Sequence, residues 1–509
     1  MSGGTNSMLA KLAQLRSDTS LDYGRPSGLA IVTALLLLVV TVATWRRCFS
    51  PLSDLPGPFW ASITRLWHVK IIIAGDQNLV LSRLHEKYGH FIRMAPGEVS
   101  VTHPDAVGKI FLNPLRKGMF YNISAIPDWR YQTPMSTLDP KEKIERSKAF
   151  SSGYAQSNVI KYEDDINPLI EKLCGWLDRY AESGEPMNLD KFLLYTAFDV
   201  VGEVLFSKPF GFIEKGEDLG SSIAKNLAQE SIGTPVAQFR WAQLLLGNPL
   251  VTTLGLNPGS MLMDTAMTAF RERQKNPDAR YDIVAHWFRY LKEHPDRTNL
   301  RNIEAQTTTN VAAGSDTVTC ALQSILYHLT LHPATYDRAR AEIDAARQEG
   351  RCGGKVVSFT DTQKLPYLQA CIKEGLRIHA PVPMGLQRVA PKGGLTIGER
   401  TFPEGTTLSI NPWVLHHSKE LWGDDADDWS PERWLVEDTA ALDKNWIPFG
   451  AGFNACPGQH VARMQLSKIC ATIIRDYDLK LVDPSKPWKW MAYFTMVPNS
   501  WPVYVAKRA

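Results

Sequence analysis

The stretch Pro448-Phe449-Gly450-Ala451-Gly452-Phe453-Asn454-Ala455-Cys456-Pro457-Gly458 places a single cysteine directly before a segment with helical periodicity. A thiolate is stabilised where the amides at a helix N-terminus face the sulfur. Because Pro457 has no amide hydrogen, the donors would be Gly458 and Gln459. The glycines allow a tight loop whose backbone lies close against a flat group. The stretch therefore indicates either a planar cofactor held by Cys456 or, more commonly for a lone cysteine, a small buried hydrophobic side chain.

The composition is that of an ordinary globular protein. Its 509 residues include 56 basic and 53 acidic side chains, for a formal net charge of +3. Domains that bind nucleic acid usually carry a strong basic excess, so nucleic acid is not expected as a partner. The 7 cysteines are odd in number and contain no CxxC pair, which predicts neither a disulfide framework nor a zinc site.

Residues Gly28–Trp45 form an uncharged apolar run. As a helix this run would be about 27 Å long, close to the hydrocarbon thickness of an endoplasmic reticulum bilayer. A cleaved signal peptide is the alternative, but residues 1–27 are longer and more mixed in charge than the n-region of a signal peptide, and Arg46-Arg47 follows the run at once. We therefore predict an uncleaved transmembrane anchor over residues 28–45, preceded by an N-terminal segment. Lys11, Arg16 and Arg25 precede the run, and Arg46, Arg47 and Arg65 follow it, so the count of flanking positive charges is a tie. The adjacent Arg46-Arg47 pair tips the balance toward a cytosolic location for the residues that follow.

The rest of the chain predicts one large domain. Prolines between Pro51 and Pro58 cannot continue the membrane helix, so residues 46–58 are predicted to form a hinge, and neither a repeat nor a second linker divides residues 59–509. Apolar residues at helical spacing dominate, which predicts a mainly α fold with small β-sheets. The predicted helices are Asn158–Ala181, Leu189–Leu205, Tyr281–Lys292, Ile303–Leu331, Ala334–Gln348, Leu368–Ile378 and Gln459–Tyr477. The predicted strands are Phe91–Met94, Glu98–Thr102, Leu395–Ile397, Thr407–Ile410 and Val503–Ala506.

The longest predicted helix contains Ala313-Gly314-Ser315-Asp316-Thr317. One interpretation is structural, because Ala-Gly allows close helix packing and a helical threonine often donates its hydroxyl to the carbonyl four residues earlier. The other is functional: beside a cofactor, Gly314 would leave room for a small ligand, while Asp316 and Thr317 would relay protons. The pattern alone leaves both open.

Two further short patterns follow downstream. Glu374-Gly375-Leu376-Arg377 puts a carboxylate and a guanidinium on one helix face, where an exposed pair would contribute only about 0.2–0.5 kcal/mol. Pro431-Glu432-Arg433-Trp434 supplies a second arginine. If these charges meet in the core, breaking their contacts would cost about 3–5 kcal/mol, because one charge would be left uncompensated.

Along the chain, these three patterns and then the Cys456 loop follow in the order of the signatures of the cytochrome P450 family, which together they resemble. The resemblance extends from about Leu55 to the C-terminus. The resemblance implies the cytochrome P450 fold, here with an N-terminal transmembrane helix. It implies that Cys456 is the iron ligand of haem b, that Asp316 and Thr317 serve catalysis through proton delivery, and that Glu374, Arg377 and Arg433 form a buried cluster that supports the cysteine loop. The loop residues implied to contact the cofactor are Phe449, Gly450, Asn454 and Gly458.

Asn454 departs from the family, which usually has an arginine there to pair with a haem propionate. An amide can donate to a carboxylate but supplies no countercharge. By resemblance to the family's helix C, Lys143 and Lys148 are predicted to contact the propionates, and Arg388 is a further candidate. The alternative for the two lysines is an ordinary solvated helix face.

The resemblance implies a haem-thiolate monooxygenase that inserts one oxygen atom of O2 into a lipophilic small molecule, in fungal secondary metabolism. Electrons would come from NADPH through a flavoprotein reductase, because the chain has no flavin or nicotinamide motif. The expected location is the endoplasmic reticulum membrane, single-pass, with the catalytic domain facing the cytosol. By family position, the pocket would be lined by Tyr121–Trp129, Asn310–Thr317, Pro381–Gly385 and Tyr493–Val497. The reductase would dock near Cys456, on Lys143, Arg146, Lys148, Arg463 and Lys468.

Two alternatives to monooxygenation stay open. One is another haem-thiolate reaction, such as isomerisation, dehydration or oxidative coupling. The other is a non-catalytic haem-binding membrane protein, since a fold does not guarantee a function. The substrate itself and the position of its oxidation are not encoded in any pattern that we recognise.

Overall fold

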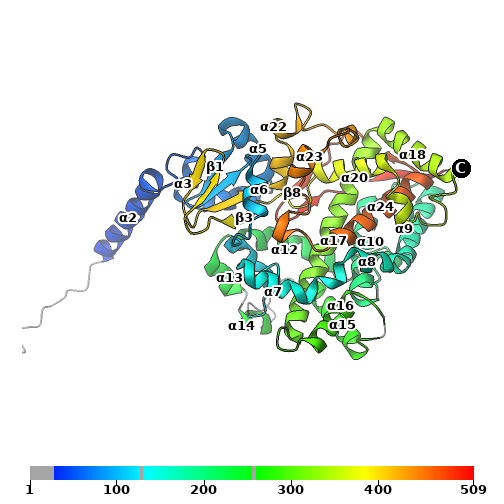
Figure 1. The fold of residues 1–509 in the computed structure, drawn as a ribbon, viewed down its shortest axis with the longest axis horizontal. Coiled ribbons are helices and arrows are strands. Elements are labelled where there is room, and N and C mark those ends of the chain that lie inside the picture. Colours follow the sequence, from blue (N-terminus) through cyan, green and yellow to red (C-terminus); the bar gives the residue numbers. More distant parts are fainter. Residues whose placement is uncertain (1–27, 126–129, 247, 255–259, 279, 509) are drawn as a thin grey trace, which may run out of the picture.

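The computed structural model describes residues 28–125, 130–246, 248–254, 260–278 and 280–508. The predicted N-terminal segment 1–27, and residues 126–129 of the predicted pocket segment, lie outside these ranges. Helices form most of the fold, and a smaller region of strands lies toward the end from which α2 projects (Figure 1). The helices are α2 Gly28–Thr44, α3 Phe59–Ile63, α4 Leu66–Ala74, α5 Gln77–Tyr88, α6 Ala106–Phe111, α7 Pro140–Phe150, α8 Gln156–Val159, α9 Glu163–Ser183, α10 Leu189–Phe206, α11 Phe212–Lys215, α12 Ser222–Val236, α13 Arg240–Leu246, α14 Pro249–Thr253, α15 Ser260–Lys275, α16 Ile283–Glu293, α17 Leu300–Leu331, α18 Pro333–Gln348, α19 Phe359–Thr362, α20 Pro366–Ile378, α21 Pro412–His416, α22 Lys419–Trp422, α23 Ala440–Asn445 and α24 Gln459–Asp476. The strands are β1 Phe91–Ala95, β2 Glu98–Val101, β3 Leu386–Val389, β4 Leu395–Ile397, β5 Arg400–Phe402, β6 Thr407–Ile410, β7 Tyr477–Leu481, β8 Trp490–Ala492, β9 Met496–Pro498 and β10 Val503–Lys507.

The longest helix, α17, organises the helical region. Its N-terminus is capped by Asn299, whose side chain accepts a hydrogen bond from the amide of Asn302, and it continues for 32 residues to Leu331. Pro333 then begins α18, since a proline fits the first turn of a helix. α17 packs against α10, α15, α20 and α24, and its second half is almost entirely buried. The predicted central helix is therefore confirmed.

The largest sheet has four strands in the order β1-β2-β6-β3. β2 and β6 are parallel, with Val99 opposite Leu408, and the other pairs are antiparallel. All four residues of β2 are buried, so this strand lacks the alternation of an exposed strand. The buried apolar residues of β2 and β6 belong to one cluster with Ile110 and Phe111 of α6.

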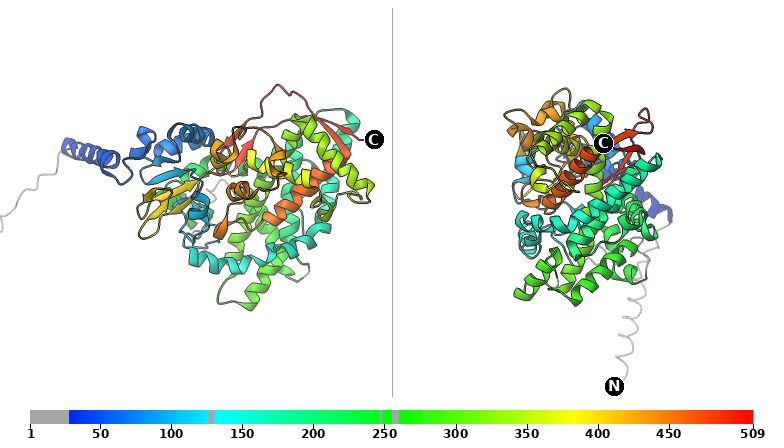
Figure 2. Two further views of the ribbon diagram at one scale, coloured as in Figure 1. Left: turned by 45° about the horizontal axis from the view of Figure 1, so that its top comes forward. Right: turned by 90° about the vertical axis from the view of Figure 1, so that its right-hand side faces the viewer.

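The apolar helix α2 stands apart from the rest of the protein. It has no buried residue, and Figures 1 and 2 show it projecting from the body of the fold. A π-helical turn, Trp45–Phe49, continues it, so that the span long and apolar enough to cross a membrane is Gly28–Phe49, with a mean hydropathy of 2.3. Helical structure thus runs past Trp45 and stops at Ser50, whose extended ψ of 153° is typical of a residue before proline.

The proline-rich segment after the anchor is packed against the sheet region. Leu52 and Leu55 are buried in the same apolar cluster as the sheet. The amide of Arg93 donates to the carbonyl of Pro56 at 2.9 Å, and Arg400 pairs with Asp54 at 2.6 Å. Residues 52–56 of the predicted hinge are therefore tied to the sheet region.

Each predicted helix overlaps an observed one, namely α9, α10, α16, α17, α18, α20 and α24, and each predicted strand overlaps β1, β2, β4, β6 or β10. The predicted start at Asn158 is wrong in detail, because α8 and a 3-10 turn, Ile160–Tyr162, precede α9. The unpredicted strands β3, β5, β7, β8 and β9 have only three to five residues, too few for periodicity to stand out.

Candidate active site

Cys456 lies in a closed loop ahead of α24. Its amide donates to the carbonyl of Phe449 at 2.8 Å. Gly450 and Gly452 have φ values of 67° and 59°, which glycine adopts without strain. A Cβ on Gly452 would lie 2.2 Å from the carbonyl oxygen of Phe111, so only glycine fits there. These two glycines therefore determine the path of the backbone before Cys456.

The sulfur of Cys456 is the one reactive group that this loop presents. The amides of Gly458 and Gln459 donate to it, as the sequence predicts, and lower its pKa, although burial by the surrounding protein raises the pKa by more. The side chain still has exposed surface, whereas Cys470 on α24 is fully enclosed. A Cβ on Gly458 would lie 3.8 Å from the sulfur, so that glycine leaves the space beside it free. An accessible sulfur with two amide donors does not fit the buried hydrophobic interpretation.

Behind the loop, Glu374 of α20 is the centre of a buried ionic network. Arg377 binds its carboxylate with two hydrogen bonds, of 2.8 and 2.9 Å, and both side chains are fully buried. Arg433 Nε donates to Glu374 Oε1 at 3.0 Å. The indole of Trp434 and the amide of Ser430 add two more donors, at 2.9 and 3.0 Å. Every lone-pair direction of this carboxylate is thus used, which is the condition under which a buried ion pair is stable.

A chain of hydrogen bonds joins this network to the cysteine loop. Arg377 Nη1 donates to the carbonyl of His416 at 2.8 Å, and His416 Nε2 accepts the amide of Ile447 at 2.9 Å. The carbonyl of Ile447 then accepts the amide of Gly450 at 3.0 Å. Burial and the Arg377 charge hold the pKa of His416 well below its usual range, so the ring is neutral and can accept. The network therefore supports the backbone that positions Cys456.

Three cations gather on the other side of the loop. Lys143 of α7 donates to the carbonyl of Phe453, which ties α7 to the loop. Lys117 and Arg388 are buried, and the Arg388 guanidinium lies 3.4 Å from the Tyr121 hydroxyl. In the described part of the chain these cations bond to carbonyl or hydroxyl oxygens rather than to carboxylates. Burial and the charges of Arg388 and Lys143 lower the pKa of Lys117 to about 6, so this amine carries its full charge at neutral pH only with an anion beside it.

Such a cluster fits an anionic group beside the cysteine loop. Arg388 Nε is buried without a partner, and burial followed by the Arg388 charge also lowers the pKa of Lys143. Two carboxylates would neutralise this excess of positive charge. Only Lys143 and Arg388 have a sequence signal. Lys117 follows no motif, and sequence reasoning missed it.

Three further residues with predicted contacts, Lys148, Asn454 and Lys468, have different surroundings. Lys148 pairs with Glu145 at 2.6 Å on the exposed face of α7, so the structure does not bring it to the loop. Asn454 is half-buried at the end of a 3-10 turn, Gly452–Asn454. The prediction that Lys468 belongs to a docking surface is wrong, because its side chain is fully buried and pairs with Glu163.

The Ala313–Thr317 motif of α17 has features of both the structural and the functional interpretation. A Cβ on Gly314 would lie 3.0 Å from Val201 Cγ2 of α10, so Gly314 serves close packing, and the prediction that it leaves room for a small ligand is wrong. Thr317 Oγ1 donates to the carbonyl of Ala313 at 2.9 Å, the back-bond that the structural interpretation predicts. Ala313 is nevertheless exposed, although α17 runs through the middle of the fold. The Ala313 face of the helix therefore borders open space.

Asp316 is buried on a different face of α17. Its Oδ2 accepts a hydrogen bond from Asn226 Nδ2 of α12 at 2.9 Å, while Oδ1 is buried without a partner. Burial first and the nearby charge of Glu230 second raise the pKa of Asp316 well above its usual value. The surroundings of Asp316 thus favour its protonated form, next in sequence to Thr317.

Three of the predicted pocket segments meet in one apolar cluster. Phe494 stacks on Phe120 with ring centroids 5.7 Å apart, and Tyr121 and Met384 pack beside them. The fourth segment contributes Asn310, whose side-chain Nδ2 has no partner. Phe120 was not predicted, because it precedes the segment that family position indicates. The result is an apolar wall.

Comparison with known proteins agrees with this geometry. The sequence profile described as Cytochrome P450 matches residues 56–501. A cytochrome P450 monooxygenase of Aspergillus flavus is 31% identical over 89% of this chain and 92% of its own length, and cicH, a cytochrome P450 monooxygenase of Emericella nidulans, is 31% identical over 93% and 97%. Pisatin demethylase of Fusarium vanettenii is 29% identical over 89% and 88%. With its accessible cysteine, glycine loop and buried Glu-Arg-Arg network, the chain belongs to the cytochrome P450 family of haem-thiolate monooxygenases, which use haem b, O2 and electrons from NADPH.

Proposed function

We propose that Cys456 is the thiolate ligand of haem b in this monooxygenase. The observation that carries the proposal is the accessible sulfur with two amide donors, in a loop joined by hydrogen bonds to the Glu374 network. Haem supplies the binding of dioxygen and the cleavage of its O–O bond, which a thiolate ligand favours. The loop's part is to hold the sulfur at one position and to keep the backbone close to a flat ring.

The three cations Lys117, Lys143 and Arg388 would bind the haem propionates. Buried cations without carboxylate partners are costly, and two propionates would provide the missing negative charge. This arrangement explains how the chain manages without an arginine at position 454. Asn454 would contribute an amide hydrogen bond only.

Thr317 and Asp316 would handle protons for the reaction. The Thr317 hydroxyl can exchange its bond to Ala313 for a bond to a water molecule, since a helical back-bond is weak. Burial raises the pKa of Asp316, which favours its protonated form. The pair can therefore accept a proton from solvent and present it on the open face of α17.

The substrate class that fits best is a lipophilic small molecule with few polar groups. The Phe120–Phe494 cluster offers apolar contact, and Asn310 offers one free amide donor to a carbonyl or hydroxyl oxygen. Relatives named cytochrome P450 monooxygenase come from several filamentous fungi. We take this as support for a role in fungal secondary metabolism.

The proposed location is the endoplasmic reticulum membrane, with the catalytic domain on the cytosolic side. The α2 span supports anchoring. Exposed apolar side chains of α13 and α14 support it further, since Trp241, Leu245 and Leu250 are 61–68% exposed. These helices follow α12, which packs against α4 close behind the anchor. A membrane-facing surface near α2 accounts for both observations.

An NADPH-dependent flavoprotein reductase is the proposed electron donor. Its docking surface would lie near Cys456, where Lys148 is exposed and Arg463 is half-buried, 5.2 Å above the Phe449 ring. Such rim charges change the association rate more than the chemical step. Turnover that does not respond to ionic strength would contradict docking by charge.

The carbon monoxide difference spectrum of the reduced protein tests the proposed ligand. Wild type should show the thiolate-type Soret band, and Cys456→Ala should lack it. The matched control is Cys48→Ala, which removes an exposed cysteine beside the anchor and should keep the band. A band that survives in Cys456→Ala would refute the assignment. Product that forms without NADPH and reductase would instead favour an isomerase or dehydratase.

A further inference from the structure

The short turn between β8 and β9 presents an aromatic side chain to the proposed substrate pocket. Residues 493–495 connect the two paired strands. The Phe494 ring stacks on Phe120 with ring centroids 5.7 Å apart and packs against the apolar wall described above. Within the turn, the amide of Tyr493 donates to the carbonyl of Thr495 at 3.1 Å. The position of the Phe494 ring therefore depends on what holds this turn.

Two side chains of α12 hold the tip of the turn. The amide of Phe494 donates to Thr234 Oγ1 at 3.2 Å. The amide of Thr495 donates to Glu230 Oε2 at 3.0 Å, and the Thr495 hydroxyl lies 2.7 and 2.8 Å from the two oxygens of the same carboxyl group. Thr234 and Thr495 are buried, so these bonds are shielded from water. Two successive amides at the tip are thus bound by one helix.

The two ends of the hairpin have attachments of their own. Gln77 Nε2 of α5 donates to the carbonyls of Ala492 and Tyr493 at 2.9 and 2.8 Å. The amide of Met496 donates to the carbonyl of Pro381 at 2.9 Å. Loss of the bonds to α12 would therefore release the tip of the turn while the strands stay in place.

Helix α12 is itself attached to the fold through polar contacts on one face. Asn226, Glu230 and Thr234 are four residues apart, which places them on the same face of the helix. Asn226 Nδ2 donates to Asp316 Oδ2 of α17 at 2.9 Å. Of the 15 residues of α12, which are all described, only four are buried. Apolar burial alone therefore contributes little to the position of this helix.

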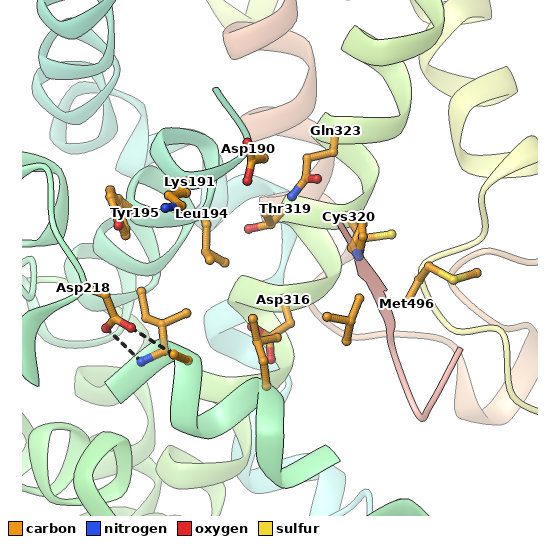
Figure 3. A pocket seen from close by; sticks show the side chains of 15 residues that line it. Asp190, Lys191, Leu194, Tyr195, Asp218, Asp316, Thr319, Cys320, Gln323 and Met496 are labelled. Carbon is orange, nitrogen blue, oxygen red and sulfur yellow. Dashed lines mark hydrogen bonds between the residues drawn. The ribbon is translucent and has the colours of Figure 1, made fainter. Parts of the chain in front are cut away.

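The apolar packing beneath α12 is also incomplete. A cavity of about 310 Å³ lies between α10, α12, α17 and β9. Figure 3 shows this cavity, with Asp316 of α17 and Met496 of β9 among the side chains around it. Ile223 and Leu227 of α12 line it, so part of their apolar surface faces open space. The hydrogen bonds from α12 to the turn therefore matter for where both of them lie.

We propose that Glu230 and Thr234 are positioning residues for substrate selection: they hold the turn of residues 493–495 so that Phe494 faces the flat apolar part of a substrate. Glu230 has the larger share, because it accepts both the amide and the hydroxyl of Thr495. The substrates favoured are lipophilic molecules with an aromatic portion, since aromatic rings stack on one another. The inference rests on the proposed lipophilic pocket. It gives a role to two residues of α12 that no sequence motif contains.

The test measures how tightly two azoles bind to the holoenzyme, followed by the shift of the haem absorbance. Clotrimazole carries several aromatic rings that can contact the apolar wall, whereas imidazole has no apolar portion. Glu230→Ala removes both bonds to Thr495. Clotrimazole should then bind about tenfold more weakly, while imidazole keeps its affinity.

Glu230→Gln separates a positioning role from a general loss of stability. Its amide oxygen can accept the Thr495 amide, and its NH2 group can donate to the Thr495 hydroxyl, so the clotrimazole affinity should return close to the wild-type value. The control Ser231→Ala removes a bond to Ala228 within α12 and should change neither affinity. Equal clotrimazole affinities of Glu230→Ala and wild type overturn the proposal, as does an equal loss of affinity for both azoles.

A double substitution shows whether Glu230 acts through Phe494. Glu230→Ala/Phe494→Ala should bind clotrimazole no more weakly than Phe494→Ala alone, because the ring that Glu230 positions is already absent. Losses that add up overturn the proposal. If Glu230→Ala does not fold, Thr495→Val takes its place in both measurements, since it removes only the hydroxyl that Glu230 accepts.

The same titrations distinguish a failure of this inference from a failure of the proposed pocket. If Phe494→Ala keeps the wild-type clotrimazole affinity, the pocket is wrongly placed and the proposal falls with it. A loss of affinity in Phe494→Ala without a loss in Glu230→Ala contradicts the positioning role alone.

Discussion

Glu374 and Asp316 are both buried carboxyl groups near the proposed cofactor, yet their surroundings differ. Glu374 accepts hydrogen bonds from Arg377, Arg433, Trp434 and Ser430, whereas Asp316 has Asn226 on one oxygen and nothing on the other. The first group has hydrogen-bond donors on both of its oxygens, so it stabilises the fold. The second has a pKa that burial raises and an oxygen without a partner, so it is available for chemistry. The number of partners, rather than burial, separates structural from functional acids here.

The largest effect is expected from Glu374→Ala. This change leaves two buried guanidinium groups without their carboxylate, which should lower the free energy of unfolding by about 3–5 kcal/mol. Urea denaturation measures the stability, and the haem absorbance per protein measures cofactor retention. Glu349→Ala breaks an exposed pair with Arg351 and should cost less than about 1 kcal/mol. If Glu374→Ala and Glu349→Ala lose the same free energy of unfolding, Glu374 does not have the structural role assigned to it.

Asp316→Asn should affect turnover and leave stability almost unchanged. The amide keeps the size of the side chain but cannot supply a proton, so product formation should fall about 10²-fold. The hydrogen peroxide released per NADPH should rise, and the melting temperature should stay close to that of wild type. Asp483→Asn, at an exposed loop position, should change none of these quantities. A large drop in the melting temperature of Asp316→Asn would instead show that Asp316, like Glu374, has a structural role.

Lys143 and Lys148 of α7 extend this comparison to the proposed propionate site. Lys143→Met removes a cation that contacts the loop, at a cost of about 1.5–3 kcal/mol in haem binding, the range for a charge-assisted hydrogen bond. Haem transfer to apomyoglobin should accelerate about 10- to 100-fold by the same energy scale. Lys148→Met removes only an exposed ion pair and should transfer haem at the wild-type rate. If both lysines lie on an ordinary solvated helix face, Lys143→Met and Lys148→Met should instead transfer haem at the same rate.

Gly314→Ala should have the smallest effect. Alanine favours a helix by about 1 kcal/mol over glycine, and this gain offsets a Cβ contact of 3.0 Å with a flexible valine. We expect the free energy of unfolding to change by less than about 1 kcal/mol. Carbon monoxide affinity should be unchanged, because the glycine faces α10. Weaker carbon monoxide binding at unchanged stability would show that Gly314 serves the ligand side after all.

The sequence predicted the elements whose patterns are long or chemically distinctive. The Glu374–Arg377 spacing puts both charges on one helix face, and the glycines before Cys456 permit only a tight loop, so both were accessible to sequence reasoning. Lys117 and Glu230 were not, because each is an isolated charge whose meaning comes from neighbours 271 and 265 residues away, Arg388 and Thr495. Gly314 was predicted to face the ligand but faces α10, because the sequence does not show toward which neighbour a helical glycine points.

The way in which the anchor joins the domain also limits how the enzyme meets its substrate. Helical structure ends at Phe49, and Leu52 is already buried against the sheet. Almost no free chain remains for pivoting, so the domain keeps a nearly constant tilt relative to the bilayer. A compound dissolved in lipid would then approach the same face at every encounter. For preparing a soluble form, removal of residues 1–49 keeps Leu52 and Leu55 in the apolar cluster, whereas removal of residues 1–58 would strip both from it.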